Sequence, residues 1–195
     1  SSIVMTGDTG PIQTYDWQFG DGNSAGTEHT SHTYTAPGTY NVSFYAISTT
    51  GCEDIITKQV EVSPIPVADF TVAPVCNEDN SVFNDASTVN PIDGNVIDSW
   101  SWDFGDGNSS TAQNPSHIYA DENVYNVTLT VETNKACTNS FTTQATVYPL
   151  PLPDFSTVPV CLEEATSFVD QSGVSNNHTS NQITDWAWDF GDGNT

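Results

Sequence analysis

The sequence predicts an all-β fold, organised as a tandem array of small β-sandwich domains. A seven-residue motif, Trp-Asp-Phe-Gly-Asp-Gly-Asn, occupies residues 102–108 and 188–194, and it returns at 17–23 with Gln18 in place of the first aspartate. The copies begin 85 and 86 residues apart, and a fixed period of this kind is the signature of a repeat architecture. Apolar residues alternate in the segments that follow each other along the chain, and none keeps a helical apolar period for long.

The strands of one repeat can be placed from this alternation. Residues 100–104 carry aromatic side chains at every second position, which puts all three rings on one face of a strand. Residues 125–131 alternate apolar with polar side chains, as expected for a half-buried antiparallel strand. Asp106-Gly107 follows the aromatic strand and predicts a tight hairpin with a type I′ turn, which needs positive φ at both central residues.

Proline-rich stretches at 64–66 and 149–153 separate the repeats. They divide the chain into an N-terminally truncated repeat (1–63), a complete repeat (64–149) and a C-terminally truncated repeat (150–195). We therefore expect the chain to be an internal segment of a longer polypeptide. Short linkers that contain proline favour a semi-rigid connection between domains.

The chain carries far more negative than positive charge. Lys58 and Lys135 are the only basic residues against 25 acidic ones, which gives a formal net charge of −23. Such a surface repels nucleic-acid phosphates and anionic lipids, so we expect no nucleic-acid partner and no membrane insertion. It also attracts divalent cations, and it suits a solvated protein in a salty exterior.

Four cysteines lie at repeat-locked positions, which indicates disulfides and an oxidising compartment. Two pairings fit the period. One is a bridge inside the complete repeat, Cys76–Cys137, with Cys52 and Cys161 paired outside the segment; we favour it because a duplicated domain normally carries its own bridge. The other links Cys52 to Cys76 and Cys137 to Cys161 across the seams, and it stays open because both spacings are compatible with the repeat.

Weak calcium ligands are present. Asp103, Asp106 and Asn108 place side-chain oxygens close together, and Glu78 and Asp79 add two carboxylates near a cysteine. The spacing lacks the alternate oxygen ligands of an EF-hand loop. We favour the interpretation that the aspartate caps its own turn by accepting backbone N–H groups. The sequence predicts no catalytic residues and no cofactor, with calcium as a secondary possibility.

The repeated residues resemble the signature of the PKD domain, a small immunoglobulin-like β-sandwich. The resemblance rests on the seven-residue motif, on residues 114–119 (Asn-Pro-Ser-His-Ile-Tyr) and on the strand at 125–131. It implies tandem immunoglobulin-like (PKD) domains of about 85 residues each. The positions that carry the fold signature are Trp17, Phe19, Gly20, Asp21, Gly22, Trp102, Phe104, Gly105, Asp106, Gly107, Trp188, Phe190, Gly191, Asp192, Gly193, His117, Tyr119 and Tyr125.

The resemblance extends to the PKD repeats of very large surface proteins of Bacteroidota, which type IX secretion exports as adhesins or filaments. It implies a non-enzymatic structural or adhesive segment of an extracellular, cell-surface protein that serves as stalk, spacer or fibre in gliding, attachment or predation. Its partners would be other repeats of the same chain, with homo-oligomeric or lateral filament assembly and an unknown glycan or protein target. The alternative is a set of accessory modules that space or dock a secreted polysaccharide- or protein-degrading enzyme.

Overall fold

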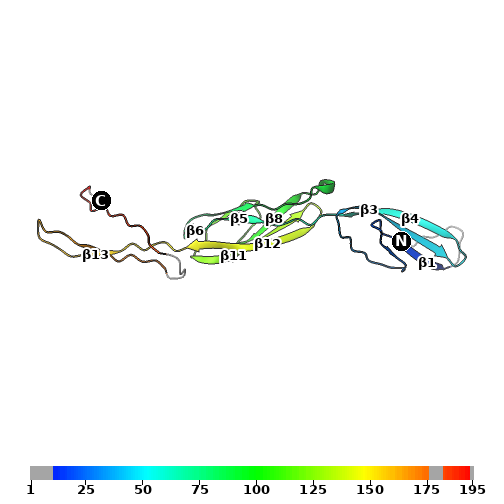
Figure 1. Cartoon of the computed structure of the whole chain (residues 1–195), viewed down its shortest axis with the longest axis horizontal. Helices are drawn as coiled ribbons and strands as arrows, with labels where there is room; N and C mark the ends of the chain where they lie inside the picture. Colours follow the sequence, from blue (N-terminus) through cyan, green and yellow to red (C-terminus); the bar gives the residue numbers. More distant parts are fainter. Residues whose placement is uncertain (1–10, 176–181, 194–195) are drawn as a thin grey trace. The chain divides into compact units, whose positions relative to one another are not determined.

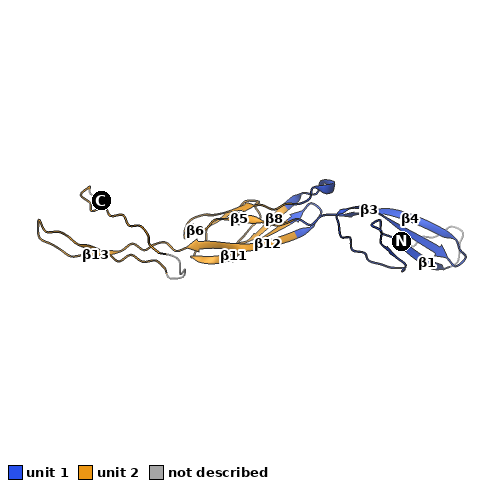
Figure 2. Ribbon diagram, in the orientation of Figure 1, with its two compact units in different colours: residues 1–66, 89–98, 132–138 blue, residues 67–88, 99–131, 139–195 orange. Residues whose placement is uncertain are grey.

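A computed structural model gives the structure of the chain, and it describes residues 11–175 and 182–193. Within these residues the secondary structure consists of short β-strands and one three-residue 3-10 helix, η1 (Ile92–Gly94) (Figure 1). The prediction of an all-β fold is confirmed. Two compact units are described separately below: unit 1 takes in residues 1–66, 89–98 and 132–138, and unit 2 takes in 67–88, 99–131 and 139–195 (Figure 2).

Unit 1 contains a four-stranded antiparallel sheet with the order β2-β1-β3-β4. Its strands are β1 (Ile12–Gln18), β2 (Ser24–Ala25), β3 (Gly38–Ser48) and β4 (Glu53–Val62). The strands β3 and β4 form a long hairpin whose register runs without interruption from Gly38↔Val62 to Ile47↔Glu53. Trp17 of β1 lies opposite Phe44 of β3, and their ring centroids are 4.3 Å apart.

Unit 1 also includes two loop segments of the complete repeat, 89–98 and 132–138, which contact the first proline-rich seam. The buried Asn95 donates a hydrogen bond from Nδ2 to the carbonyl of Pro64 at 3.3 Å. The Nζ atom of Lys135 lies 2.9 Å from Oε1 of Glu61. The seam is thus held by a buried amide and by an ion pair, in addition to the stiffness of its prolines.

Unit 2 contains most of a two-sheet sandwich, whose longer strands extend into unit 1. The smaller sheet has the order β10-β7-β5, formed by β10 (Ser116–His117), β7 (Ser81–Asp85) and β5 (Phe70–Val72). The larger sheet has the order β6-β12-β11-β8-β9. Its strands are β6 (Val75–Cys76), β12 (Thr138–Tyr148), β11 (Asn123–Thr133), β8 (Ile97–Asp103) and β9 (Ser109–Ser110).

The core of unit 2 lies between these two sheets. Val127, Leu129 and Val131 of β11 are fully buried, as the alternation in this segment predicts. From the smaller sheet, Phe70 and Phe83 pack on Trp102, with ring centroids 4.9 and 5.6 Å apart. Close-packed aromatic rings of this kind contribute a large share of the apolar area that a domain of this size buries.

Residues 150–175 repeat the beginning of this sandwich. The strands β13 (Phe155–Thr157) and β14 (Phe168–Asp170) pair antiparallel with Phe155 opposite Asp170. This register is equivalent to the pairing of Phe70 with Asp85 in β5 and β7. All three residues of β14, however, are exposed.

Candidate functional site

The repeated motif forms the connection between β8 and β9. The backbone N–H of Phe104 donates to the carbonyl of Asn108 at 3.1 Å, and Asp103 pairs with Ser109 at the ends of the strands. Positive φ occurs at Gly105 (79°) and Gly107 (92°), which flank an aspartate that does not share it. The predicted type I′ turn at Asp106-Gly107 is therefore wrong, because that turn needs positive φ at both of those residues.

Asp106 stabilises this connection from within. Its Oδ1 atom accepts the backbone N–H of Asn108 at 3.0 Å, and its Oδ2 atom accepts the side-chain amide of the same residue at 3.0 Å. An aspartate that bonds to the backbone two residues onward forms an Asx turn, which fixes the loop without any other ligand.

Gly105 allows the loop to approach β11 closely. A Cβ atom at this position would lie 2.5 Å from the carbonyl oxygen of Asn126, and the residue also has positive φ. Gly107 has the same backbone requirement, but no atom lies within 4 Å of the position of its Cβ. The two glycines are therefore required for different reasons, one for space and conformation and the other for conformation alone.

His117 connects the loop to a stack of aromatic rings. Its Nε2 atom lies 2.7 Å from Oδ2 of Asp106, and its ring stacks on Phe104 with centroids 4.4 Å apart and planes 6° from parallel. Tyr119 meets the edge of the imidazole and donates its hydroxyl to the Phe104 carbonyl at 3.1 Å. Tyr125 then stacks on Tyr119 at 3.9 Å. The histidine and the aspartate thus satisfy one another at the edge of the aromatic stack.

The electrostatics follow from these contacts. Partial burial opposes ionisation of Asp106, but hydrogen bonds from Asn108 and His117 outweigh it, and the pKa of the carboxyl is lowered. In the first repeat the hydrogen bond from His32 lowers the pKa of Asp21 to about 2. Burial raises the pKa of the Tyr119 phenol, and the nearby charge of Asp106 adds to the increase. The motif is therefore built around a persistent carboxylate.

The first repeat reproduces the same arrangement. His32 lies 2.6 Å from Asp21, and Tyr34 donates its hydroxyl to the Phe19 carbonyl at 3.0 Å. Trp17 donates its indole N–H to the carbonyl of Thr27, as Trp102 does to that of Ala112. Gln18 is the exception: its amide bonds to Asp16, whereas Asp103 at the equivalent position accepts the N–H of Gly105 at 2.9 Å.

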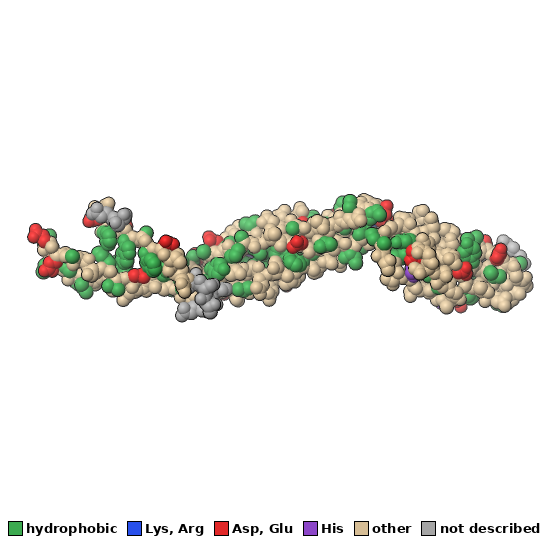
Figure 3. Space-filling model, viewed as in Figure 1, with side chains coloured by type: hydrophobic (Ala, Val, Ile, Leu, Met, Phe, Trp, Pro, Cys, Tyr) green, Lys and Arg blue, Asp and Glu red, His purple; other side chains and the backbone are tan. Residues whose placement is uncertain are grey.

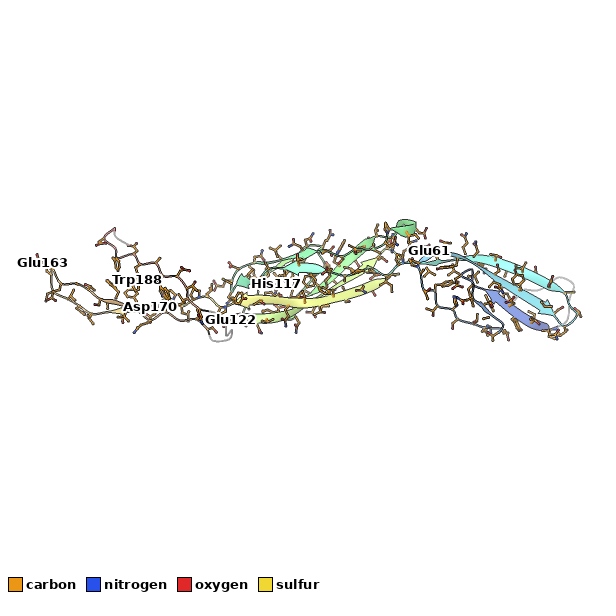
Figure 4. All side chains as sticks on the ribbon, viewed as in Figure 1. Glu61, His117, Glu122, Glu163, Asp170 and Trp188 are labelled. Atoms are coloured by element: carbon orange, nitrogen blue, oxygen red, sulfur yellow. The ribbon has the colours of Figure 1, made fainter. Side chains whose placement is uncertain are left out.

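In the third repeat the described part of the motif keeps its backbone form. Gly191 and Gly193 again have positive φ, and Asp189 accepts the N–H of Gly191 at 2.9 Å. Asn194 lies outside the described residues. The indole of Trp188, which is labelled in Figure 4, contacts Phe155 and Phe168 at centroid distances of 5.6 and 5.9 Å.

Asp85 also recurs one repeat later, as Asp170, and the sequence patterns considered above did not single it out. Its carboxylate accepts the indole N–H of Trp100 at 2.8 Å and the amide of Gln113 at 3.1 Å. Asp170 accepts the indole N–H of Trp186 at 2.9 Å in the same way. The 85-residue spacing of the two aspartates was the signal that could have identified them.

The weak calcium candidates lie at two turns of unit 2. Within 11–175 and 182–193, no three or more His, Cys, Asp or Glu side chains are grouped in positions that could hold a metal ion. Asp103 and Asp106 are engaged by N–H groups of their own loop. Glu78 and Asp79 lie in the turn after β6, where Glu78 has a positive φ of 70° and Asp79 donates its N–H to the Cys76 carbonyl.

The cysteines differ from expectation. All four are free thiols in the structure. Cys76 ends β6 and lies opposite Tyr148, the last residue of β12, whereas Cys137 immediately precedes the first residue of that eleven-residue strand. A strand advances about 3.3 Å per residue, and a disulfide spans a Cα separation of only about 4.4–6.8 Å. The structure therefore contradicts the predicted Cys76–Cys137 bridge, because almost the full length of β12 separates the two residues.

No helix within the described part of the chain is long and apolar enough to cross a membrane.

Acidic side chains are spread over the face of the molecule shown in Figure 3, and apolar side chains gather in several patches between them. The repeated motif thus presents a structural hairpin, and its charged and aromatic groups are directed at one another.

Comparison with known proteins places these features in a family. A model described as the PKD domain matches residues 3–64 and 63–148. Collagenase ColA and Collagenase ColQ1, both from Bacillus cereus, are 43% identical over 54 residues and 44% identical over 55 residues. Each match covers 28% of this chain and only 6% of the collagenase.

Two solved structures are similar to parts of the chain. The PKD1 domain of Vibrio anguillarum Epp is 30% identical, with a TM-score of 0.38 and coverage of 43% of this chain and 93% of that domain. The PKD1 domain of the Vibrio cholerae metalloprotease PrtV is 29% identical, with a TM-score of 0.38 and coverage of 43% and 96%. The two family matches together span well over half of the sequence, so the chain belongs to the PKD domain family.

Proposed function

We propose that the chain is a structural and adhesive repeat segment of a large extracellular bacterial surface protein or filament. The observation that carries the proposal is that the side chains of the repeated motif bond to and stack on one another. Asp106 and His117 satisfy one another, and the rings around them stack, so the motif stiffens each module. A module of this kind serves distance and mechanical continuity, and many copies extend the reach of whatever lies at the end.

The seam supports the same role. Pro64 and Pro66 are buried, and the Lys135–Glu61 ion pair and the Asn95–Pro64 hydrogen bond hold the chain where one repeat follows another. A stalk needs such junctions, because flexible linkers would dissipate a pulling force as chain extension. The negative charge keeps neighbouring molecules soluble. Type IX secretion in a Bacteroidota host, the secreted location and a glycan or protein target are proposed on the family resemblance.

The test is to examine the source organism. Antibodies against this chain should label thin extracellular filaments in negative-stain images, and the full-length gene should encode many further repeats. Labelling confined to compact soluble particles in the culture medium would contradict the proposal.

The collagenase matches favour a second candidate, in which the repeats are accessory modules that space or dock a secreted degradative enzyme. The PKD modules would then carry no reaction themselves and would act on an insoluble substrate through a separate catalytic domain. A gene that joins these repeats to a protease or glycosidase domain would favour this role. Co-sedimentation of the chain with insoluble collagen, and its loss after the collagen is solubilised, would support it further.

A further inference from the structure

The hairpin between the two long strands of a repeat holds a cysteine in a fixed turn. In the complete repeat, the backbone N–H of Thr133 donates to the Cys137 carbonyl at 3.0 Å, and the N–H of Cys137 donates to the Thr133 hydroxyl at 3.2 Å. Ser48 and Cys52 make the same two bonds between β3 and β4, at 2.9 and 3.1 Å. Cys52 and Cys137 are called here the hairpin cysteines, and the turn fixes the backbone of both in the same way.

The hairpin cysteine of the complete repeat lies beside the seam with the preceding repeat. The Sγ atom of Cys137 is 4.0 Å from the carbonyl oxygen of Ser63, the residue directly before Pro64. In the same turn, Lys135 forms its ion pair with Glu61. The turn is therefore attached to the end of β4 at two points, and its thiol lies against the last residue before the seam.

The other cysteine position of a repeat lies at the opposite end of the long strands. Cys76 ends β6, which pairs parallel with β12 so that Cys76 lies opposite Tyr148 at the arrowhead of that strand (Figure 1). The N–H of Asn77 donates to the Tyr148 carbonyl at 2.7 Å. Cys76 and Cys161 are called here the β6 cysteines, and in both the carbonyl accepts an N–H three residues onward at 3.1 Å.

The repeat period makes Ser63 and Tyr148 equivalent residues. They are 85 residues apart, and each directly precedes the first proline of a seam. The carbonyl at this position thus has two neighbours in a repeat array. One is the residue that follows the β6 cysteine of its own repeat, as Asn77 does for Tyr148. The other is the hairpin thiol of the following repeat, as Cys137 is for Ser63.

We propose that successive repeats are joined by a disulfide between the β6 cysteine of one repeat and the hairpin cysteine of the next. A disulfide spans Cα atoms about 4.4–6.8 Å apart, and neighbouring strands lie about 4.8 Å apart, so two cysteines beside one carbonyl are within its range. The two thiols lose two protons and two electrons as the S–S bond forms. A small-molecule disulfide such as oxidised glutathione accepts them and is reduced to two thiols.

This pairing differs from the two that the cysteine spacing allows. The length of β12 separates the cysteines of one repeat, as described above. The cross-seam pairing of Cys52 with Cys76 takes the hairpin cysteine from the earlier repeat, and all ten residues of β4 separate Cys52 from Ser63 at the seam. Both cysteines lie at the seam only when the β6 cysteine comes from the earlier repeat and the hairpin cysteine from the later one.

The inference does not rest on the proposed function, because repeats follow one another in this chain whether they serve a fibre or an enzyme. The bridge would keep the hairpin of one repeat attached to the end of the preceding repeat. The Lys135–Glu61 ion pair makes a similar connection, but salt weakens a partly exposed ion pair. A covalent link at the same place is unaffected by ionic strength.

The test uses the full chain with one additional period. A second copy of residues 65–149 is inserted directly after Pro149, which then takes the place of Pro64 in the new seam. This doubled chain has two consecutive complete repeats, called here the first and the inserted repeat. Cys76 of the first repeat and Cys137 of the inserted repeat belong to the new seam. The reduced protein is equilibrated with reduced and oxidised glutathione, and the remaining thiols are alkylated.

Mass spectrometry of the monomer band from a non-reducing gel should find one disulfide, between a Cys76 peptide and a Cys137 peptide. The native chain has both cysteines inside one repeat, and it should form no such disulfide under the same conditions. The native chain is therefore the control for pairing within a repeat. Because the two copies in the doubled chain have identical sequences, single substitutions are needed to locate the bridge.

Four variants of the doubled chain locate it. Cys76→Ser in the first repeat and Cys137→Ser in the inserted repeat should each reduce the yield of the disulfide by about tenfold or more, because each removes one of its two thiols. The same two substitutions in the other copies, Cys137→Ser in the first repeat and Cys76→Ser in the inserted repeat, are the matched controls and should leave the yield unchanged. Absence of the disulfide from the doubled chain, equal losses in all four variants, or a mixture of pairings would each overturn the proposal.

Discussion

Trp102 and Trp17 occupy equivalent positions of the repeated motif and make the same indole hydrogen bond to a carbonyl ten residues onward, yet one is buried and the other half-buried. The difference lies in what covers each indole. Phe70 and Phe83 lie on Trp102, whereas the face around Trp17 is a groove. The comparison separates two sources of order in a PKD repeat: the hairpin forms from local contacts, and the core depends on strands far away in the sequence.

The geometry of the hairpin does not depend on whether a second sheet packs on the first. In both repeats the carboxylate accepts the same pair of bonds from the asparagine two residues later, and the histidine lies within 2.7 Å of it. Their ring stacks agree closely as well. The motif therefore keeps the same geometry in the two-sheet sandwich of unit 2 and in the single sheet of unit 1.

The largest effect is expected from truncating the covering rings. Phe83→Ala should destabilise the complete repeat by about 3–5 kcal/mol, because it removes a fully buried ring and leaves a cavity. Phe168→Ala, the equivalent change at a 39% exposed ring, should cost less than about 1 kcal/mol. Hydrogen exchange measured by mass spectrometry on peptides from β7 and β14 resolves the two regions. Equal losses would show that the two phenylalanines have the same environment in solution, contrary to the comparison.

The next effect concerns the two glycines of the loop. Gly107→Ala should cost about 1–2 kcal/mol, the penalty for an L-residue with positive φ. Gly105→Ala should cost clearly more, because its Cβ atom would also meet the Asn126 carbonyl at 2.5 Å. Urea unfolding of the two variants gives the ranking, and Gly22→Ala in the first repeat serves as a second conformational control. A smaller loss for Gly105→Ala than for Gly107→Ala would remove the close approach to β11 as an explanation.

A pH effect of moderate size follows from Asp21. Its folded pKa of about 2 lies below the ordinary value of 3.8, so the ionised carboxyl stabilises the folded state above pH 3.8. That contribution is lost as the pH falls from about 4 through 2. Melting temperatures measured across this window should fall more steeply for the native chain than for Asp21→Asn. Asp106→Asn should flatten the curve in the same direction, because the pKa of Asp106 is also lowered. Parallel curves for the native chain and both variants would show that these carboxylates titrate alike in the folded and unfolded chain.

The smallest effect is expected from metal ions. The carboxylates of Asp103 and Asp106 are engaged by loop N–H groups, so added calcium or EDTA should leave the melting temperature of the chain unchanged. Differential scanning calorimetry at constant ionic strength makes the comparison, with magnesium as the control for general screening of the acidic surface. A calcium-specific rise would place a cation among these side chains.

Much of the fold was predictable because its signals are local and repeated. The alternation in residues 125–131 identifies the buried face of β11, and the period identifies the hairpin as a unit of construction. The conformation of the loop was not predictable, because Asp106-Gly107 satisfies a two-residue turn in isolation. In the structure Gly105 and Gly107 have positive φ instead, and Gly105 lies against the backbone of Asn126, a residue distant in sequence.

The cysteines show the same limit at longer range. The 85-residue period shows which cysteines are equivalent between repeats. Disulfide pairing, however, depends on which end of a strand each cysteine occupies. Cys76 and Cys137 lie near opposite ends of β12, and spacing along the chain contains no information on that. The partners of Asp85 were missed for a related reason, since Trp100 and Gln113 reach the carboxylate from separate loops and strands.

The ion pair between Lys135 and Glu61 has a practical consequence. Lys58 and Lys135 are the only sites at which trypsin can cut this chain, and one of them is held by a carboxylate at the seam while the other lies within β4. Limited trypsin digestion therefore reports on two regions of the chain. Cleavage after Lys135 indicates that the seam has opened, and cleavage after Lys58 indicates local unfolding of the sheet of unit 1. With only two cleavable bonds, the chain resists trypsin-like proteases by composition as well as by folding.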